Sequence, residues 1–498
     1  MEGIVSALNG IIWSPALIYL CLGAGLFYSI MTRFVQVRMF GEMIRLLFKG
    51  KSSSDGISSF QALAVSLAGR VGMGNIAGVA AAIGFGGPGA VFWMWVVAFL
   101  GASTAYVEST LGQVYKERDA ITGEYRGGPA YYFERALGQK WYGILFAIAS
   151  IVACGIFLPG VQANGVVNAG MQVMGADMQY IILGVILVVL GLIIFGGIKR
   201  IATFTEFAVP FMAIGYILLA IIIMVMNIGQ VPEVFGMIIG DAFTAQAGFG
   251  AAIGWGVKRG VYSNEAGQGT GPHAASAAEV DHPAQQGLVQ AFSVYVDTLL
   301  VCSATAFMIL STGMYNIQGT LEEGEFLVQN VDAATEISSP AFTQMAMEAV
   351  YGSFGDTFIA VAIFFFAFTT ILAYYYIAEV NITYLTSRVF GRGAHKGGIF
   401  AIKIIIMLMV AYGGLNSAGY IWGLGDVGVG LMAWLNIIGI LIIFFAGAKP
   451  ALAMLKDYED QRKAGVANYT FDPAKFGIKN APYWEERARH HNQGNLHR

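Results

Sequence analysis

Charged residues are scarce in this chain. Only 12% of its 498 residues are Asp, Glu, Lys or Arg, against about 25% in soluble domains, so the chain cannot cover its own surface with polar groups. A soluble globular protein is therefore excluded. The formal net charge of −3 also argues against a nucleic-acid partner, which a basic protein would favour. The three cysteines, Cys21, Cys154 and Cys302, fall in apolar runs, which indicates small core residues and not a disulfide framework or a metal site.

What the chain has in place of charge is apolar sequence. Hydrophobic residues make up 56% of it and gather in runs of about 20, the length that crosses a bilayer as a helix. The runs are rich in Gly, Ala, Phe and Met, which is typical of packed helices and not of the alternating strands of a barrel. We predict an all-α membrane protein with eleven spans, at about 12–32, 58–84, 89–114, 141–168, 178–197, 203–228, 236–262, 287–312, 355–386, 397–416 and 425–447.

Lysine and arginine predict the orientation of these spans. The connections after spans 1, 3, 5, 7 and 9, together with the tail, hold 27 of the 28 basic residues, and Lys258 and Arg259 count among them. The positive-inside rule then places the N-terminus outside and the C-terminus in the cytoplasm, as a multi-pass protein of a bacterial or archaeal plasma membrane. The one basic residue left over is Arg70, inside the second span.

Two spans contain glycines that interrupt a helix. One predicted break covers 69–75, with the sequence Gly72-Met73-Gly74 at its centre, and the other covers 248–256. Non-helical backbone at membrane depth persists only where protein or a water-filled cavity satisfies its N–H and C=O groups. A pair of interrupted spans in corresponding positions of two halves indicates a secondary transporter, whose half-helix ends bind ions and substrate.

The two breaks divide the chain into four parts. We expect an extra N-terminal helix with a basic connection (1–57), a five-helix repeat (58–228), a second repeat of inverted topology (229–447) and a cytoplasmic tail (448–498). No continuous polar pore indicates a channel, and no nucleophile–base or metal constellation at depth indicates an enzyme.

Long strings of the sequence resemble one transporter family. They are "GNIAGVAAAI" with "GGPGAVFWMWVVAFLG" after it, and "GVKRGVYSNEAGQGTGPHAASAAEVDHPAQQGLVQAFSVYVDTLLVCSATA". They are similar to the alanine/glycine:cation symporters, also called sodium:alanine symporters, of the amino acid–polyamine–organocation superfamily. The resemblance implies the 5+5 inverted repeat of the bacterial leucine transporter. It further implies import of small neutral amino acids, chiefly alanine and glycine, with sodium as coupling ion and no other cofactor; some similar proteins carry glutamine.

The resemblance also implies binding sites. Substrate would lie at the first break, against the backbone and side chains of Arg70, Gly72, Met73, Gly74 and Asn75. The second break would face it with Ala252, Ile253, Gly254 and Trp255. Sodium would bind the carbonyls of Ala68, Val71 and Phe366 and the hydroxyls of Thr369 and Thr370, which suits a hard cation. The alternative for the two threonines is a hydrogen bond to their own helix.

The chain departs from the family at three positions. The family often has threonine where this chain has Arg70 and Met73, and tryptophan where it has Tyr374. A mid-membrane arginine needs a partner, and we expect Asp297 to be that partner, either as a structural lock or beside the substrate.

Two further predictions concern polar residues and glycines. Asn164 and Asn168, with Gln162, either hydrogen-bond between helices or reach the substrate. The string "SNEAGQGTGPH" reads as a connection after span 7, and its glycines suit either a bending gate or a rigid turn.

Overall fold

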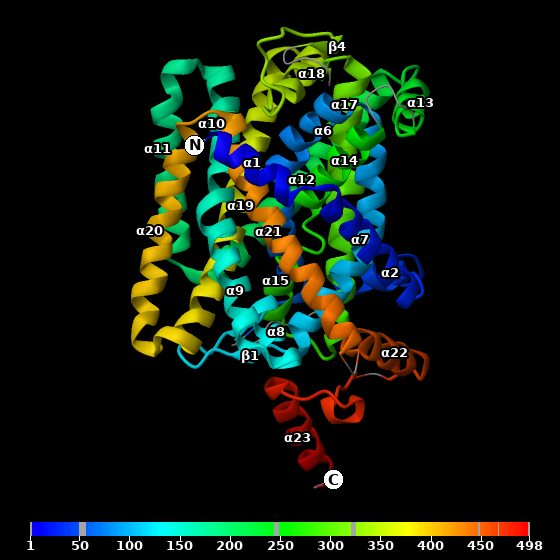
Figure 1. The fold of residues 1–498 in the computed structure, drawn as a ribbon, viewed down its shortest axis with the longest axis vertical. Coiled ribbons are helices and arrows are strands. Elements are labelled where there is room, and N and C mark those ends of the chain that lie inside the picture. The colour runs from blue at the N-terminus through cyan, green and yellow to red at the C-terminus, as the bar shows by residue number, and fades with distance from the viewer. Residues whose placement is uncertain are drawn as a thin grey trace.

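The computed structural model describes residues 2–48, 56–243, 249–319, 325–446, 449–466 and 468–496. Most helices run along the long axis of the molecule, and its N- and C-terminal ends lie at opposite ends of that axis (Figure 1). Two short antiparallel hairpins complete the described fold. They are β1 (Glu117–Arg118) with β2 (Tyr125–Arg126), and β3 (Asn316–Gln318) with β4 (Phe326–Gln329).

The N-terminal helices form a bent span followed by two short helices. They are α1 (Glu2–Ile12), α2 (Pro15–Met31), α3 (Val35–Arg38) and α4 (Phe40–Leu47). The axes of α1 and α2 differ by 43°. Pro15 is the first residue of α2, where its missing N–H costs nothing but where a helix from the N-terminal side cannot continue unbent.

The first half of the bundle follows. Its helices are α5 (Ser59–Arg70), α6 (Val79–Gly86), α7 (Gly89–Val114), α8 (Pro129–Leu137), α9 (Lys140–Ser150), α10 (Leu158–Met174), α11 (Gln179–Ile194), α12 (Gly197–Met226) and α13 (Val231–Asp241). π-Helical turns at Gly74–Gly78 and Ile151–Phe157 lead into α6 and α10, and a 3₁₀ turn at Ala176–Met178 precedes α11.

The rest of the chain supplies ten further helices in the described residues, the last two of them in the C-terminal tail. These helices are α14 (Phe249–Asn264), α15 (Gly271–Ala277), α16 (Pro283–Val294), α17 (Ser303–Thr312), α18 (Ala341–Tyr351), α19 (Ser353–Leu385), α20 (His395–Gly414), α21 (Ala418–Phe445), α22 (Pro450–Lys463) and α23 (Pro482–Leu496). π-Helical segments lie at Tyr295–Cys302 and Thr386–Phe390, and 3₁₀ turns at Arg392–Ala394 and Pro473–Phe476.

The helix lengths agree with a multi-pass membrane protein. Within the described residues, eight helical stretches are long and apolar enough to cross a membrane, or ten if each of two bent pairs counts as one span. The predicted span at 236–262 is not among them, because it is divided between α13 and α14.

Small residues set the closest helix contacts. α10 packs against α19 and α20, and α7 packs against α14 and α16. Gly160 of α10 and Gly413 of α20 bring their backbones together so closely that a side chain on Gly413 would overlap the Gly160 main chain. This is the packing that small residues permit between membrane helices.

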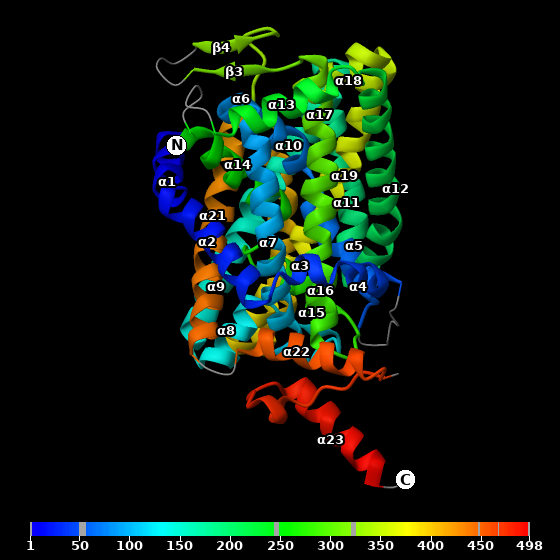
Figure 2. The same cartoon turned by 90° about the vertical axis from the view of Figure 1, so that its right-hand side faces the viewer.

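The C-terminal tail docks against the end of the bundle opposite the N-terminus (Figure 2). The indole of Trp484 in α23 is fully buried, and its Nε1 donates to the carbonyl oxygen of Gln113 at 2.8 Å. Arg487 forms an ion pair with Glu279 at 3.1 Å. The tail therefore covers Lys116, whose Nζ lies 4.3 Å from the centre of the Tyr483 ring, and burial lowers the pKa of Lys116 to about 7.

Candidate functional site

The first break lies between α5 and α6. α5 ends at Arg70, helical structure resumes at Met73 and Gly74, and the two axes differ by 53°, so the interruption falls inside the predicted range 69–75. The Gly72 N–H donates to Asn75 Oδ1 at 2.8 Å, and the Met73 N–H donates to Gln162 Oε1 at 3.0 Å. Side-chain amides thus satisfy the backbone donors that the break releases.

The predicted sodium ligands lie together beside this break. The hydroxyl of Thr370 is 2.7 Å from the Ala68 carbonyl oxygen, 3.3 Å from that of Val71 and 2.9 Å from that of Phe366. The Thr369 hydroxyl lies 3.0 Å from the same Phe366 oxygen. Both threonines are fully buried. The bonds to Phe366 are the local hydrogen bonds of the alternative interpretation, whereas those to Ala68 and Val71 cross from α19 to the break.

The second break is not where the glycines predicted it. Over the described part of 248–256 the backbone is helical, because α14 runs without interruption from Phe249 to Asn264. Within α14, Gly256 allows close packing, since a side chain there would meet the Ala90 carbonyl oxygen at 2.5 Å. The residues predicted to face the substrate are therefore helical: Ala252, Ile253, Gly254 and Trp255, whose indole stacks on Phe85 with ring centres 4.5 Å apart.

The interruption comes instead at 265–270, between α14 and α15. Here Glu265, Gly267 and Gly269 have positive φ values of 57°, 85° and 84°. Glu108 of α7 holds this loop in place: its carboxylate accepts from the N–H of Gly267 at 3.2 Å and of Gly269 at 3.1 Å. The string "SNEAGQGTGPH" therefore contains this interruption.

Asn436 of α21 completes the partners of Glu108. Its Nδ2 donates to the Glu108 carboxylate at 2.6 Å and to the Gly267 carbonyl oxygen at 2.9 Å. A buried carboxylate with three N–H donors is well satisfied as an anion.

Asp297 does not pair with Arg70, which corrects the sequence prediction. Its Oδ1 accepts from Asn75 Nδ2 at 2.6 Å and from the Ser263 hydroxyl at 3.1 Å, and its Oδ2 accepts from Thr298 at 2.7 Å. Among the residues that the structure describes, no ion pair within 4.0 Å joins Arg70 to an acid. The reason is that Asn75, from the same break as Arg70, fills the side of Asp297 that faces the break.

The guanidinium of Arg70 lies on another side of the break. Its Nη1 donates to the Gln290 carbonyl oxygen of α16 at 3.2 Å. A side chain on Gly271, the first residue of α15, would lie 2.9 Å from its Nη2. Nε and Nη2 have no hydrogen-bond partner, although the residue is only 1% exposed. Arg70 therefore lies between the two breaks as a buried cation near several acids.

The predicted polar residues of α10 divide into two groups. Asn164 donates to the Gly413 and Asn416 carbonyl oxygens at the end of α20 (3.0 and 2.7 Å), and Asn168 donates to Asn164. These are the interhelical hydrogen bonds of the first alternative. Gln162, in contrast, reaches the first break.

Met73 and Tyr374 also differ in their surroundings. The Met73 side chain packs against Gly165 of α10, so it fills space between helices. Tyr374 is buried on α19, and its hydroxyl lies close to the Glu265 carboxyl at the second break.

A cavity of about 460 Å³ opens near the N-terminal helix, on one side of the breaks. Lys258 and Arg259 both contact Asp426 there, at 2.7 and 2.5 Å. The sequence analysis placed these two cations in a basic connection between spans. In the structure they belong to α14. Tyr262 separates the cavity from the first break, because it packs on the cavity-lining Trp422 (ring centres 4.8 Å apart) and against Gly74.

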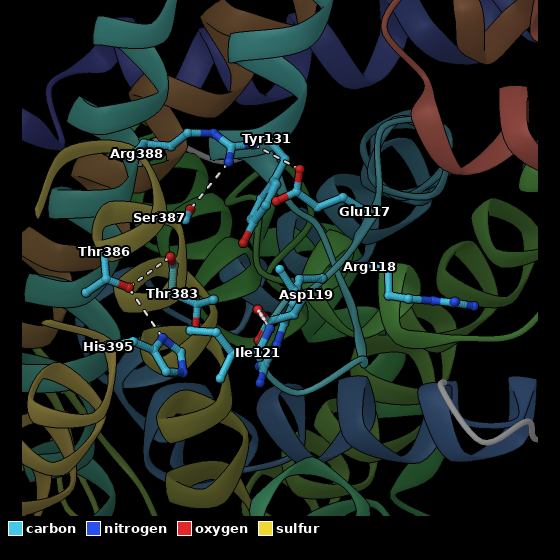
Figure 3. Close-up of a pocket in the computed structure, with 12 residues that line it drawn as sticks. Glu117, Arg118, Asp119, Ile121, Tyr131, Thr383, Thr386, Ser387, Arg388 and His395 are labelled. Carbon is cyan, nitrogen blue, oxygen red and sulfur yellow. Dashed lines mark hydrogen bonds and ion pairs between the residues drawn. The ribbon is translucent and has the colours of Figure 1, made fainter. Parts of the chain in front are cut away.

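A second cavity, of about 250 Å³, lies at the C-terminal end of α19 (Figure 3). Arg388 reaches across it to Glu117 at 2.9 Å and also pairs with Glu134 at 2.9 Å. Arg135 joins the same Glu117. This ion-pair network ties the hairpin and α8 to the end of α19.

Sequence reasoning missed the residues that hold the second break. Glu265, Thr270 and Glu108 lie at its centre, and Ser263 joins α14 to Asp297. The available signal was a glutamate followed by alternating glycines, "EAGQGTG", which is unusual for an ordinary connection between spans because alternate glycines permit several left-handed residues in succession.

Comparisons with known proteins show similarity to sodium-coupled transporters. Residues 1–473 match the model of the sodium:alanine symporter family. A putative sodium/proton-dependent alanine carrier of Bacillus subtilis is 54% identical over 99% of each chain. A sodium/proton-dependent alanine carrier of a Bacillus species is 48% identical over 89% of this chain and 97% of its own. A probable sodium/glutamine symporter of Bacillus subtilis is 40% identical over 93% and 92%.

Proposed function

The chain belongs to the sodium:alanine symporter family, and we propose that it imports alanine and similar small neutral amino acids together with sodium. A membrane-embedded symporter needs no cofactor beyond its coupling ion. Relatives named as alanine carriers are 54% and 48% identical to the chain, whereas the relative named as a glutamine symporter is 40% identical. This order favours alanine, with glutamine as the alternative substrate.

The observation that carries the proposal is the oxygen cluster around Thr370. Three backbone carbonyls from two separate helices converge on its hydroxyl within 2.7–3.3 Å. Sodium is a hard cation that prefers several oxygen ligands, and the break leaves the Ala68 and Val71 carbonyls without helical partners. We assign Ala68, Val71, Phe366, Thr369 and Thr370 as the sodium ligands.

We place the amino acid beside the first break. The backbone leaves regular α-helix there, and half-helix ends suit the carboxylate of a zwitterion. The substrate carboxylate would take the N–H groups of Gly72 and Met73, which Asn75 and Gln162 accept from in this structure. Little room is left for a large substrate side chain, since Tyr262 and Gln162 close on the glycines of the break.

Two inverted five-helix repeats account for the placement of the breaks. The first repeat would comprise α5 to α12 and the second α14 to α21, so that each break lies in the first span of its repeat. The bent pair α1–α2 would be the extra span. The location of the two termini at opposite ends supports an odd number of crossings (Figure 1), and the distribution of basic residues favours a cytoplasmic C-terminus.

The two cavities suit alternating access. The cavity beside Asp426 would open to the outside, with Tyr262 and Trp422 between it and the break. The cavity beside Arg388 would lie at the cytoplasmic end, where ion pairs between Glu117, Glu134 and Arg388 close the path. Release of the substrate inward then requires those pairs to separate.

The test is uptake of radiolabelled alanine into liposomes that contain the purified protein, with and without a sodium gradient. Thr370→Val keeps the side-chain shape and removes the hydroxyl. We expect the sodium concentration for half-maximal uptake to rise at least tenfold, because one ligand and its orienting contacts are lost. Thr312→Val of α17 is the control, since the Thr312 hydroxyl bonds only to its own helix, at Met308 and Ile309.

An unchanged sodium dependence in Thr370→Val would exclude this sodium site. Competition by unlabelled alanine, glycine, serine and glutamine in the same liposomes identifies the substrate. Stronger competition by glutamine than by alanine would select the alternative.

A further inference from the structure

Four charged side chains lie buried around the two breaks. Arg70, Glu108, Glu265 and Asp297 are each at most 2% exposed, and Arg70 interacts electrostatically with all three acids without an ion pair to any of them. Transfer of an ion from water into such an interior costs several kcal/mol unless other charges or hydrogen bonds compensate it. Three acids against one arginine leave an excess of negative charge at the centre of the bundle.

The three carboxyl groups differ in how well their anions are satisfied. Glu108 and Asp297 each accept three hydrogen bonds, which is the environment of an ionised carboxylate. Glu265 has fewer donors: its Oε2 accepts from the Thr270 hydroxyl at 2.8 Å, and the Tyr374 hydroxyl lies beside the carboxyl. Its Oε1 is buried without a hydrogen-bond partner.

The surroundings of Glu265 favour a proton as its counter-charge. The small cavity beside it has mainly apolar walls, among them Val65, Ala274, Ala373 and Ile377. A sodium ion prefers several oxygen ligands, and beside the carboxyl itself these walls hold only the hydroxyl groups of Ser66, Thr270 and Tyr376. A proton needs none, because it forms a covalent O–H bond and abolishes the charge.

Glu265 is also in a position to sense both breaks. It belongs to the second break, with φ 57°, and a side chain on Gly69 next to the first break would lie 3.3 Å from its Oε2. The cavity beside it extends along α5 and α15 to Ser66 and Tyr376, on the side of the breaks away from the Asp426 cavity.

Two relatives are named sodium/proton-dependent alanine carriers, and we propose that Glu265 is the residue of this chain that binds the proton in the loaded transporter and carries it across the membrane with alanine and sodium. The proposal rests on the sodium-coupled function above. The proton comes from water on the outer side, forms an O–H bond with the carboxylate, and returns to water on the inner side. It carries one positive charge inward in addition to that of sodium, and no other covalent bond changes. With Glu265 neutral, the anions Glu108 and Asp297 are balanced by Arg70 and the bound sodium.

The neighbours that influence this proton come from every element around Glu265. They are Arg70 on α5, Glu108 on α7, Asp297 after α16, Tyr374 on α19, Tyr262 on α14 and Cys154 before α10. Lys116, outside the spans, has a pKa lowered to about 7 by burial. A pH profile of uptake could therefore reflect Lys116, so Lys116→Met is measured beside every Glu265 variant.

The experiment uses liposomes that hold the purified protein and a pH-sensitive dye in the lumen. Sodium is equal on both sides, and alanine is added outside. We expect alanine to acidify the lumen of wild-type liposomes. Glu265→Gln resembles the protonated side chain and cannot exchange its proton, so we expect it to lose acidification and to retain sodium-driven alanine uptake within about tenfold. Glu206→Gln of α12, whose carboxylate accepts from Gln61, is the control and should keep both activities.

The outcomes separate the two proposals. Sodium-driven alanine uptake by the wild type without acidification refutes the proton site and leaves the symport function intact. Acidification that persists in Glu265→Gln also refutes it, and so does a Glu265→Gln variant that changes only the sodium dependence, which would indicate a second sodium site. Absence of any sodium-driven uptake by the wild type refutes the proposed function itself.

A second variant covers the case in which Glu265→Gln does not fold. Thr270→Val removes a hydrogen bond that favours the anion of Glu265, so the proton binds more tightly. The pH at which uptake is half-maximal should rise by about one unit, since a hydrogen bond to a charged group is worth about 1.5–3 kcal/mol and one pKa unit corresponds to about 1.4 kcal/mol. A profile that stays in place, or that shifts equally in Lys116→Met, overturns the proposal.

Discussion

The two breaks in the bundle differ in the groups that satisfy their backbone. At the first, the neutral amide oxygens of Asn75 and Gln162 accept the released N–H groups. At the second, the Glu108 carboxylate accepts from Gly267 and Gly269. One break is held by dipoles and the other by a buried charge.

Backbone conformation follows the same division. None of residues 68–75 has a positive φ, whereas Glu265, Gly267 and Gly269 all do. The first break therefore resembles a helix that has been opened, and its Ala68 and Val71 carbonyls point to the Thr370 hydroxyl. The second is a fixed loop whose shape depends on two glycines and one anion. We expect substitutions of Glu108 and of the glycines at the second break to affect mainly folding, and those at the first break to affect mainly binding.

Glu108→Ala should have the largest effect. It removes three hydrogen bonds from the second break and leaves Arg70 with one fewer compensating charge. We expect a loss of about 3–5 kcal/mol in the free energy of unfolding, as for other broken buried charge contacts, measured by thermal or denaturant unfolding in detergent. Ser109→Ala is the neighbouring control, because the Ser109 hydroxyl has no hydrogen-bond partner. Equal stability of the two variants would contradict the role of Glu108.

Alanine at Gly269 and at Gly72 compares the two breaks directly. At Gly269, with φ 84°, a new Cβ would lie 2.6 Å from Pro129 Cγ and 2.9 Å from Phe146 Cζ, so we expect a loss of about 1–3 kcal/mol in stability. At Gly72 the Cβ would lie 2.5 Å from the Thr370 hydroxyl and displace it. Gly72→Ala should mainly raise the sodium concentration for half-maximal uptake. The reverse pattern in unfolding and uptake assays would remove the distinction between the breaks.

Gly254→Ala should have the smallest effect. Gly254 is helical, and no atom lies within 4 Å of an added Cβ. Alanine is favoured over glycine in a helix by about 0.5–1 kcal/mol, so stability should be unchanged or slightly higher, and uptake should persist. If Gly254→Ala folds normally but abolishes uptake, residues 248–256 would have the functional role that the sequence analysis predicted for the second break.

These positions also explain what the sequence could predict of the fold. Gly72-Met73-Gly74 falls in an otherwise apolar span, and the interruption lies there. The glycines at 250–256 gave the same signal, yet they lie in a helix where Gly256 packs against α7. A single sequence does not distinguish a glycine that permits close packing from one that permits a turn, because both need the absence of a side chain.

Contacts around the candidate site were predictable where neighbouring residues of one helix decide them, and unpredictable where several helices meet. Thr369 and Thr370 lie next to each other on α19, and the resemblance to the symporter family indicated their carbonyl partners. Two polar side chains of the first break, Arg70 and Asn75, could have contacted Asp297. The structure shows that Asn75 makes this contact. The role of Glu108 depends on the register of α7 against the second break, which no local pattern encodes.

The contact between Gly160 and Gly413 restricts how the molecule can move. Two helices whose main chains touch cannot slide, because the larger side chains one turn away would collide. Asn164 adds two further bonds between α10 and the end of α20. We expect α10 and α20 to move as one rigid unit, and the short half-helices α6 and α15 to rotate relative to it.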